Sequence, residues 1–271
     1  MKSPSAHGKF LLLQNLHFRH PWRSELFVAS SRSNVCVATW PDYLNIDPLT
    51  MIKKPKMVLI DVDGTLVDSV PDLAYCVDQM MLAIGRETHG EAKVRDWVGN
   101  GVERLVRRAL VGQLDGEPDE ESFQQAYPIF LKLYAENTCN RSKLYDGVLE
   151  GLDYLQSAGY KLGCVTNKDE QFTLPILEQL NIRDRFEIIV CGDTLAVKKP
   201  DPGPLLHAAK KLAVNPAASL MLGDSQSDIK AARAAGFQII CMSYGYNHGE
   251  DVRKFDPDLV VDSMVELKNY L

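Results

Sequence analysis

Short apolar segments, each followed by a polar turn and then by a helical pattern, recur along this chain. Strands are expected at residues 57–60, 161–165, 186–190, 220–222, 237–242 and 259–261. Apolar residues at helical spacing separate most of them, at residues 148–155, 173–180, 205–212 and 229–235. This alternation predicts an α/β fold with a doubly wound, Rossmann-like parallel sheet that carries helices on both faces.

Residues 70–145 follow a different pattern, with helical spacing and no strand signal. Ser69 is expected to cap the first helix, Pro71 fits its first turn, and Asp72 favours the positive end of the helix dipole. Loops are expected where the pattern breaks, at residues 97–101 and 112–119. We predict a helical cap domain at 70–145, inserted into a core formed by 56–69 and 146–271.

Residues 1–55 form an N-terminal extension without clear periodicity and with few acidic residues. Three interpretations compete. The segment is a poorly ordered tail or sequence upstream of a true start at Met51 or Met57, or a targeting peptide, or an arm that binds a partner. The first interpretation is favoured.

The formal net charge of the 271-residue chain is -6, which provides no basic surface for nucleic acid or for an anionic membrane. No apolar run reaches the roughly 18 residues of a membrane span, so none is expected. The six cysteines include no CxxC pair and are expected to be free thiols in a reducing cytoplasm. The oligomeric state does not follow from the sequence.

Polar residues cluster just after the expected strands. In chain order they are Asp61, Asp63, Thr166, Asn167, Lys199, Asp224 and Asp228. Each has an ordinary explanation by itself, as a turn, a helix cap or a solvated side chain. Ligands of open parallel sheets bind at the carboxyl ends of the strands, so we expect these residues to converge on one site.

Other polar and aromatic residues keep a structural interpretation, as surface, helix or packing residues. They are His89, His207, His248 and the cluster Tyr244–Tyr246. Arg104, Arg107 and Arg108 form a solvated helix face, or one of them holds a substrate carboxylate. We favour the solvated face for at least two of the three.

Four segments resemble, in the expected order, the motifs of the haloacid dehalogenase superfamily. They are residues 58–69 (VLIDVDGTLVDS), 164–168 (CVTNK), 198–202 (KKPDP) and 222–228 (LGDSQSD). Residues 97–102, 192–195 and 199–202 further resemble the phosphoglycolate phosphatases of that superfamily. The resemblance covers about residues 57–265 and implies a helical cap inserted after the first motif.

The resemblance implies a phosphatase that acts on a small phosphorylated metabolite through an aspartyl-phosphate. Asp61 would be the nucleophile, and Asp63 would protonate the leaving group and then activate water. Thr166, Asn167 and Lys199 would contact the substrate phosphate, and Thr166 and Lys199 would also stabilise the transferring group.

The resemblance also implies Mg²⁺, whose hard oxygen ligands would be the Asp61 carboxylate, the Asp63 backbone carbonyl and the Asp224 carboxylate. Asp228 would orient Lys199 or a metal-bound water. Magnesium would offset the repulsion between the attacking carboxylate and the phosphate.

2-Phosphoglycolate is the expected substrate, and several alternatives remain. They are another small-phosphate phosphatase or pyrophosphatase, a sugar-phosphate mutase with the same core motifs, and a non-catalytic phosphate-binding protein. A dehalogenase is disfavoured because it does not need the acid/base of Asp63, and a phosphonate hydrolase would need an amine-forming lysine in the cap. A binding protein would not need Asp61.

Overall fold

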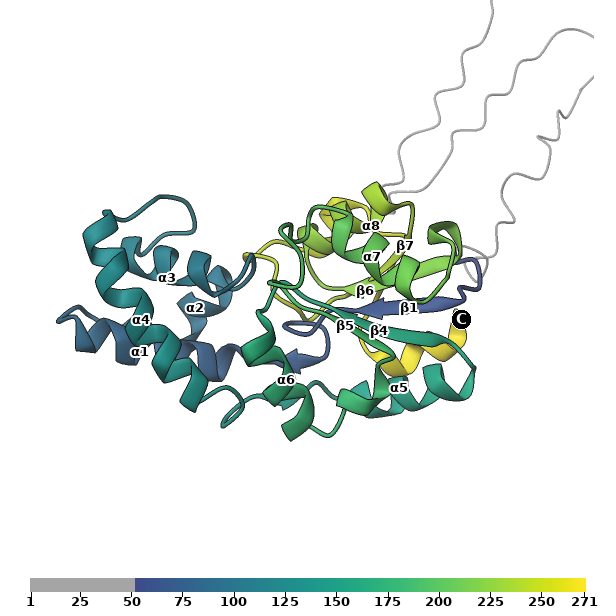
Figure 1. Cartoon of the computed structure of the whole chain (residues 1–271), viewed down its shortest axis with the longest axis horizontal. Helices are drawn as coiled ribbons and strands as arrows, with labels where there is room; N and C mark the ends of the chain where they lie inside the picture. Colours follow the sequence, from purple (N-terminus) through teal and green to yellow (C-terminus); the bar gives the residue numbers. More distant parts are fainter. Residues whose placement is uncertain (1–51) are drawn as a thin grey trace, which may run out of the picture. The chain divides into compact units, whose positions relative to one another are not determined.

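The computed structural model describes residues 52–271, so most of the expected N-terminal extension lies outside the described residues. A six-stranded parallel sheet with strand order β5-β4-β1-β6-β7-β8 forms the core (Figure 1). Its strands are β1 (Met57–Ile60), β4 (Lys161–Val165), β5 (Ile188–Val190), β6 (Ser219–Gly223), β7 (Gln238–Met242) and β8 (Leu259–Val261). The doubly wound α/β fold predicted from the sequence is confirmed.

Strand β1 lies in the middle of the sheet and is buried on both faces. It pairs in parallel with β4 on one side and with β6 on the other. Val58 and Ile60 belong to one hydrophobic cluster, while Met57 and Leu59 belong to a second cluster on the opposite face. A continuous apolar run is what a strand covered on both faces requires.

Helices cover both faces of the sheet (Figure 1). One face packs against α5 (Val148–Ser157), α6 (Glu170–Gln179) and η5 (Met264–Asn269), and the other against α7 (Gly203–Lys211) and α8 (Gln226–Ala235). Shorter 3₁₀ helices are η2 (Arg183–Arg185), η3 (Pro216–Ala218) and η4 (Val252–Phe255). Within residues 52–271, no helix combines the length and the apolar composition that crossing a membrane requires.

A helical insert follows β1 and carries its own hydrophobic cluster. Its helices are α1 (Val70–Ala83), α2 (Glu91–Trp97), α3 (Val102–Val111) and α4 (Glu120–Glu136). The cluster joins residues of all four helices with Phe172, which projects from α6 of the core. The insert and the core are therefore in apolar contact near the end of α4.

Two local features differ from the sequence-based expectation. A two-stranded antiparallel ribbon, β2 (Val67–Asp68) with β3 (Lys143–Leu144), forms where no strand was predicted. Strands of two residues are too short to produce a detectable alternation. Helix α6 begins at Glu170, before the predicted residue 173, so Pro175 lies in its second turn and not in the first turn where proline is favoured.

Asp72 connects the beginning of the insert to its end. Its buried carboxylate accepts hydrogen bonds from the backbone N–H groups of Arg141 (2.8 Å) and Ser142 (2.7 Å) and from the Ser142 hydroxyl (2.7 Å).

The predicted side-chain cap by Ser69 is wrong, because the Ser69 hydroxyl donates to Asp63 Oδ1 at 2.5 Å instead of bonding to the helix backbone.

Replacing Asp72 with alanine leaves the backbone N–H groups of Arg141, which is part-buried, and Ser142, which is buried, without this acceptor. We expect Asp72→Ala to lower the free energy of unfolding by about 2–4 kcal/mol. Asp184→Ala, at a fully exposed position, should leave it unchanged. Urea unfolding followed by circular dichroism measures both changes, and equal stability of the two variants would contradict the connecting role of Asp72.

Candidate active site

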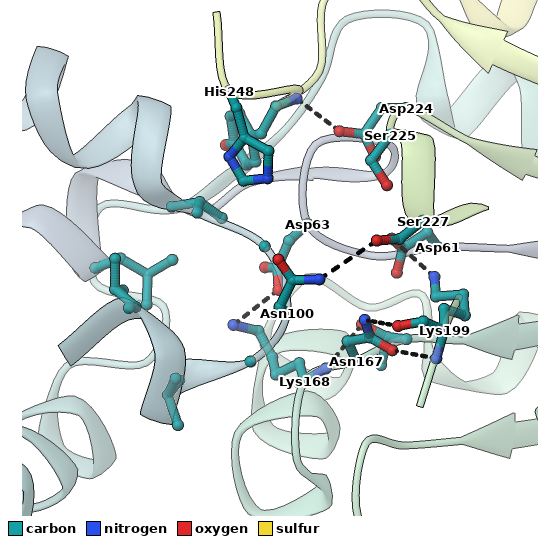
Figure 2. A pocket seen from close by; sticks show the side chains of 18 residues that line it. Asp61, Asp63, Asn100, Asn167, Lys168, Lys199, Asp224, Ser225, Ser227 and His248 are labelled. Carbon is teal, nitrogen blue, oxygen red and sulfur yellow. Dashed lines mark hydrogen bonds and ion pairs between the residues drawn. The ribbon is translucent and has the colours of Figure 1, made fainter. Parts of the chain in front are cut away.

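The predicted site residues meet at the carboxyl edge of the sheet, beside the insert (Figure 2). Because β4 and β6 flank β1, the residues that follow these three strands lie at adjacent positions. A cavity of about 680 Å³, its open mouth included, is lined from the core and by the insert loop 98–101. Six of the predicted residues line it, namely Asp61, Asp63, Thr166, Asn167, Lys199 and Asp224. The seventh, Asp228, is fully buried behind Lys199.

The ammonium group of Lys199 links two carboxylates. Its Nζ lies 2.9 Å from Asp61 Oδ2 and 2.7 Å from Asp228 Oδ1, and it donates to the Val165 carbonyl at 2.8 Å. Burial lowers the pKa of Lys199, but the carboxylates of Asp228 and Asp61 raise it more, so the net direction is upward. Lys199 therefore stays charged at neutral pH.

Asp61 follows the last residue of β1 and is held in the cavity from two sides. Its Oδ1 accepts the backbone N–H of Val62 at 2.8 Å, while Oδ2 faces Lys199. Burial raises the pKa of the Asp61 carboxyl to about 6, with Lys199 opposing this shift and Asp228 adding to it. The group is a carboxylate at neutral pH, in a site where water contributes little to its solvation.

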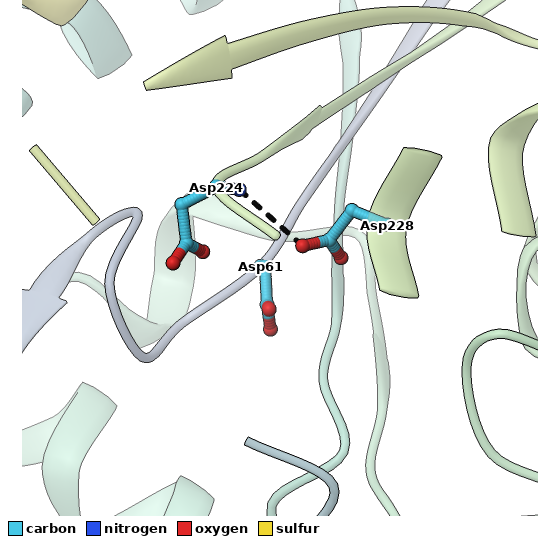
Figure 3. A group of neighbouring side chains, drawn as sticks. All are labelled: Asp61, Asp224 and Asp228. Atoms are coloured by element: carbon cyan, nitrogen blue, oxygen red, sulfur yellow. Dashed lines mark hydrogen bonds between the residues drawn. The ribbon is translucent and has the colours of Figure 1, made fainter. Parts of the chain in front are cut away.

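Asp61, Asp224 and Asp228 each place a carboxylate oxygen within 4.8 Å of the others (Figure 3). Asp224 accepts hydrogen bonds from Thr65 Oγ1 (2.8 Å) and from the backbone N–H of Tyr246 (2.6 Å). Burial, followed by the charges of Asp228 and Asp61, raises the pKa of the Asp224 carboxyl well above its usual range. An added positive charge at this position would relieve that repulsion.

The three carboxylates differ in the number of hydrogen bonds and ion pairs that they make within the protein. Asp228 accepts from Lys199, from Ser225 Oγ at 2.7 Å and from the Ser225 backbone N–H at 3.1 Å, and it completes the capping box of α8. Asp61 and Asp224 line the cavity. An oxygen-rich pair of this kind fits a divalent cation such as Mg²⁺.

Two glycines press against Asp224 and fix its position. A Cβ at Gly64, whose φ is +84°, would lie 2.2 Å from Asp224 Oδ2, and a Cβ at Gly245 would lie 2.1 Å from Asp224 Cβ. Both contacts are far inside the van der Waals distance, so any side chain at either position would displace the carboxylate.

Thr166 and Asn167 follow β4 and serve different partners. Thr166 Oγ1 accepts the backbone N–H of Lys168 at 3.2 Å, which leaves the hydroxyl hydrogen as a donor. The Asn167 side chain donates to the Lys199 carbonyl and accepts the Lys199 backbone N–H, both at 2.9 Å. Its amide therefore positions the loop that carries Lys199.

Asp63 is bonded on both carboxylate oxygens. Oδ1 accepts the Ser69 hydroxyl, and Oδ2 lies 3.1 Å from Lys168 Nζ (Figure 2). Lys168 also donates to the hydroxyl of Tyr134, a residue of α4, at 2.7 Å. Asp63 and Asp61 thus have separate lysine partners.

A family model of haloacid dehalogenase-like hydrolases matches residues 58–242, which include all of these strand ends. The chain belongs to this hydrolase family. The resemblance inferred from the four sequence motifs is confirmed.

Several relatives of this hydrolase are named phosphoglycolate phosphatase. One from Nitrosococcus oceani is 62% identical over 221 residues, which cover 82% of this chain and 98% of the relative. One from Pseudomonas putida is 46% identical over 211 residues, which cover 78% of this chain and 77% of the relative. The crystal structure of a predicted phosphoglycolate phosphatase from Haemophilus somnus superposes with a TM-score of 0.75 at 34% identity, covering 80% of this chain and 98% of the other.

Three residues of the hydrolase site were missed or misinterpreted from the sequence. No role was predicted for Lys168, although it belongs to the second motif. His248 was predicted to be a surface or helix residue, but it lines the cavity, with Nδ1 2.8 Å from the Asp96 carbonyl. Tyr246 also lines the cavity, whereas Tyr244 packs against Tyr145 as predicted. Tyr246 and His248 lie in the irregular segment between β7 and η4, which has no periodic pattern from which its path can be predicted.

None of the three arginines of α3 lines the cavity. Arg104 and Arg107 form ion pairs with exposed Glu117, which supports the solvated interpretation for these two. Arg108 is buried, and its guanidinium donates to the carbonyls of Trp97 (2.6 Å) and Gly99 (3.2 Å). Arg108 therefore holds the loop at residues 97–101.

Magnesium chloride should raise the melting temperature of the metal-free hydrolase more at pH 7.5 than at pH 5. The folded-state pKa of Asp61, about 6, lies above its ordinary value of 3.8, so ionising this group destabilises the folded protein, fully so above pH 6. A bound cation relieves this penalty, whereas at pH 5 protons compete for the carboxylates.

Thermal unfolding of the metal-free and the magnesium-loaded protein at both pH values measures the effect. Asp224→Asn should lose most of the shift, and exposed Asp184→Asn should keep it. An equal shift at both pH values would contradict the assignment of the cation to these carboxylates.

Proposed function

We propose that this hydrolase is a magnesium-dependent phosphatase that converts 2-phosphoglycolate to glycolate and phosphate through an aspartyl-phosphate at Asp61. One observation carries the proposal: a buried, ionised carboxylate at the end of the central strand, with Lys199 at 2.9 Å and a second carboxylate, Asp63, lining the same cavity. The relatives named phosphoglycolate phosphatase support the choice of substrate.

In the first step, Asp61 attacks the phosphorus atom, and the bond between phosphorus and the leaving oxygen breaks. Asp63 enters this step in its protonated form, in place of the carboxylate that pairs with Lys168 in the ligand-free site, and donates that proton to the leaving oxygen. Lys199 and the Thr166 hydroxyl stabilise the charge on the transferring phosphoryl group. In the second step, a water molecule attacks phosphorus, the bond to Asp61 breaks, and Asp63 accepts the proton of the water.

The charges of the site favour a divalent cation. The four carboxylates of Asp61, Asp63, Asp224 and Asp228 face the two ammonium groups of Lys168 and Lys199. When all are ionised, two negative charges remain uncompensated in a mostly buried site, and a dianionic substrate adds more.

Mg²⁺ would balance this excess of negative charge, and it prefers the oxygen ligands that the site offers. The carboxylates of Asp61 and Asp224 and the backbone carbonyl of Asp63 would hold it. When bound, it would supply the positive charge that lets an anionic nucleophile approach an anionic phosphate.

The insert is proposed to select the substrate, since the core residues of the site are suited to phosphate and metal. Asn100 and the neighbouring backbone N–H groups of residues 99–101 are the candidate donors for the glycolate carboxylate. Asn100 Nδ2 lies 3.4 Å from Ser227 Oγ of the core (Figure 2). The Asn100 Oδ1 atom accepts a hydrogen bond from Arg108. The buried Arg108 supports this loop and is not proposed to bind substrate directly.

We further propose that the cap spans residues 70–145 and that the enzyme acts in the cytoplasm on small phosphorylated metabolites. The cysteines of the described residues are buried free thiols, in keeping with a reducing compartment.

Asp61→Asn should abolish turnover and leave the fold intact, because an amide is a poor nucleophile and is nearly the same size as the carboxyl group. Phosphate release from 2-phosphoglycolate measures activity, and thermal unfolding checks the fold. Asp184→Asn serves as the matched control with unchanged activity. Near-full activity of a folded Asp61→Asn protein would refute the aspartyl-phosphate mechanism.

2-Phosphoglycolate should have a higher kcat/KM than a hexose phosphate, a nucleoside monophosphate, pyrophosphate or a phosphopeptide. A hydrogen-bonded carboxylate contributes about 1.5–3 kcal/mol, or roughly tenfold to a hundredfold in selectivity. Asn100→Ala should reduce this preference more than it reduces turnover of a hexose phosphate. A tenfold advantage of hexose phosphate or pyrophosphate would overturn the substrate assignment and leave the mechanism to be judged by Asp61→Asn.

A further inference from the structure

Lys168 is a buried charge in the site to which the phosphatase mechanism above gives no role. It lies three residues beyond β4, is only 3% exposed and lines the cavity. Burial lowers its pKa, but Asp63 and Tyr134 raise it more, so the net direction is upward and the side chain stays charged. A buried ammonium group needs partners of its own, because desolvation is expensive.

The partners of Lys168 differ from those of Lys199. Lys199 pairs with Asp61 and Asp228, whereas Lys168 pairs with Asp63 Oδ2 at 3.1 Å. Together with the Ser69 hydroxyl on Oδ1, Lys168 fixes both oxygens of the Asp63 carboxylate. The two lysines therefore act on different members of the aspartate pair.

Lys168 is held in turn by the insert. Its Nζ donates to Tyr134 Oη at 2.7 Å and lies 4.9 Å from the centre of the Tyr134 ring. That ring is fully buried and packs against Phe172 of α6, with 4.7 Å between ring centroids. A chain of contacts thus runs from helix α4 through Lys168 to Asp63 (Figure 2 shows its last contact).

We propose that Lys168 is a positioning residue that holds Asp63 at the leaving oxygen and at the attacking water, and that Tyr134 fixes Lys168 in this role. The inference rests on the proposed function and deepens it. Lys168 forms no bond to the substrate in this scheme, so removing it impairs the proton transfers of Asp63 and leaves the attack by Asp61 intact.

Comparing two substrates with different leaving groups separates the proton transfers of Asp63 from the attack by Asp61. Glycolate leaves as an alkoxide and needs the proton of Asp63, whereas 4-nitrophenolate is a stable anion and leaves without one. The second step, attack by water, needs Asp63 with either substrate. A loss of Asp63 positioning therefore slows both steps for 2-phosphoglycolate and only the second for 4-nitrophenyl phosphate.

The test is rapid-mixing kinetics of Lys168→Met in the magnesium-loaded enzyme. With 2-phosphoglycolate, the first turnover should slow by about tenfold to a hundredfold, a part of the usual contribution of general acid–base catalysis. With 4-nitrophenyl phosphate, a burst of one nitrophenolate per active site should form at nearly the wild-type rate, followed by slow steady turnover. Lys161→Met, at the opposite end of β4, is the matched control and should behave as the wild type.

Equal slowing of the first turnover with both esters, or wild-type kinetics, would overturn the role of Lys168. Tyr134→Phe keeps the packed ring and removes only the hydroxyl, so it provides a second test if Lys168→Met does not fold. It should show the same contrast between the two esters to a smaller extent, and wild-type first turnovers in this variant would overturn the role of Tyr134. If the wild-type enzyme releases phosphate from neither ester, the proposed function itself fails, and this inference with it.

Discussion

Placing four carboxylates at or just beyond the ends of two adjacent buried strands costs free energy that the fold has to offset. Lys199 joins Asp61 to Asp228, Lys168 pairs with Asp63, and Asp224 depends on a hydroxyl and a backbone N–H. These contacts leave an excess of negative charge beside the cavity. Burial and this excess of negative charge raise the pKa values of the Asp61 and Asp224 carboxyl groups. The same excess favours the binding of a cation, on which the proposed chemistry depends.

The insert supplies residues that line the site and residues that hold the core part of the site in place. Its loop 98–101 lines the cavity, held by Arg108 from behind, and its helix α4 reaches the core through Tyr134. The buried carboxylate of Asp72 ties the first helix of the insert to the segment that returns to the core. The proposed substrate selection and the proposed placement of Asp63 therefore both involve the inserted helices, whereas the proposed nucleophile and phosphate contacts belong to the core.

Much of the fold and of the site could be predicted because they depend on local patterns. The apolar run of β1, the alternation after Gly147 and the polar residues at the strand ends can all be read along the chain. Lys168 could not be assigned a partner, because Tyr134 lies 34 residues away on a helix whose rotation the sequence does not reveal. His248 reaches the cavity from an irregular loop. Asp72 accepts its hydrogen bonds from Arg141 and Ser142 only when the two ends of the insert come together in the fold. Convergence of distant segments, rather than the type of residue, limited the prediction.

The central place of β1 has a consequence for how the molecule acquires activity during synthesis. This strand is among the first described segments to be made, yet its neighbours β4 and β6 begin only at residues 161 and 219. Closing such long loops is slow, and a chain that ends before β6 leaves one edge of an apolar strand unpaired. The nascent chain therefore has to keep this strand from aggregating until most of the protein has been translated. Asp61 can meet Asp224 only after that point, so the carboxylate pair that is proposed to hold the cation forms only once β6 has been made.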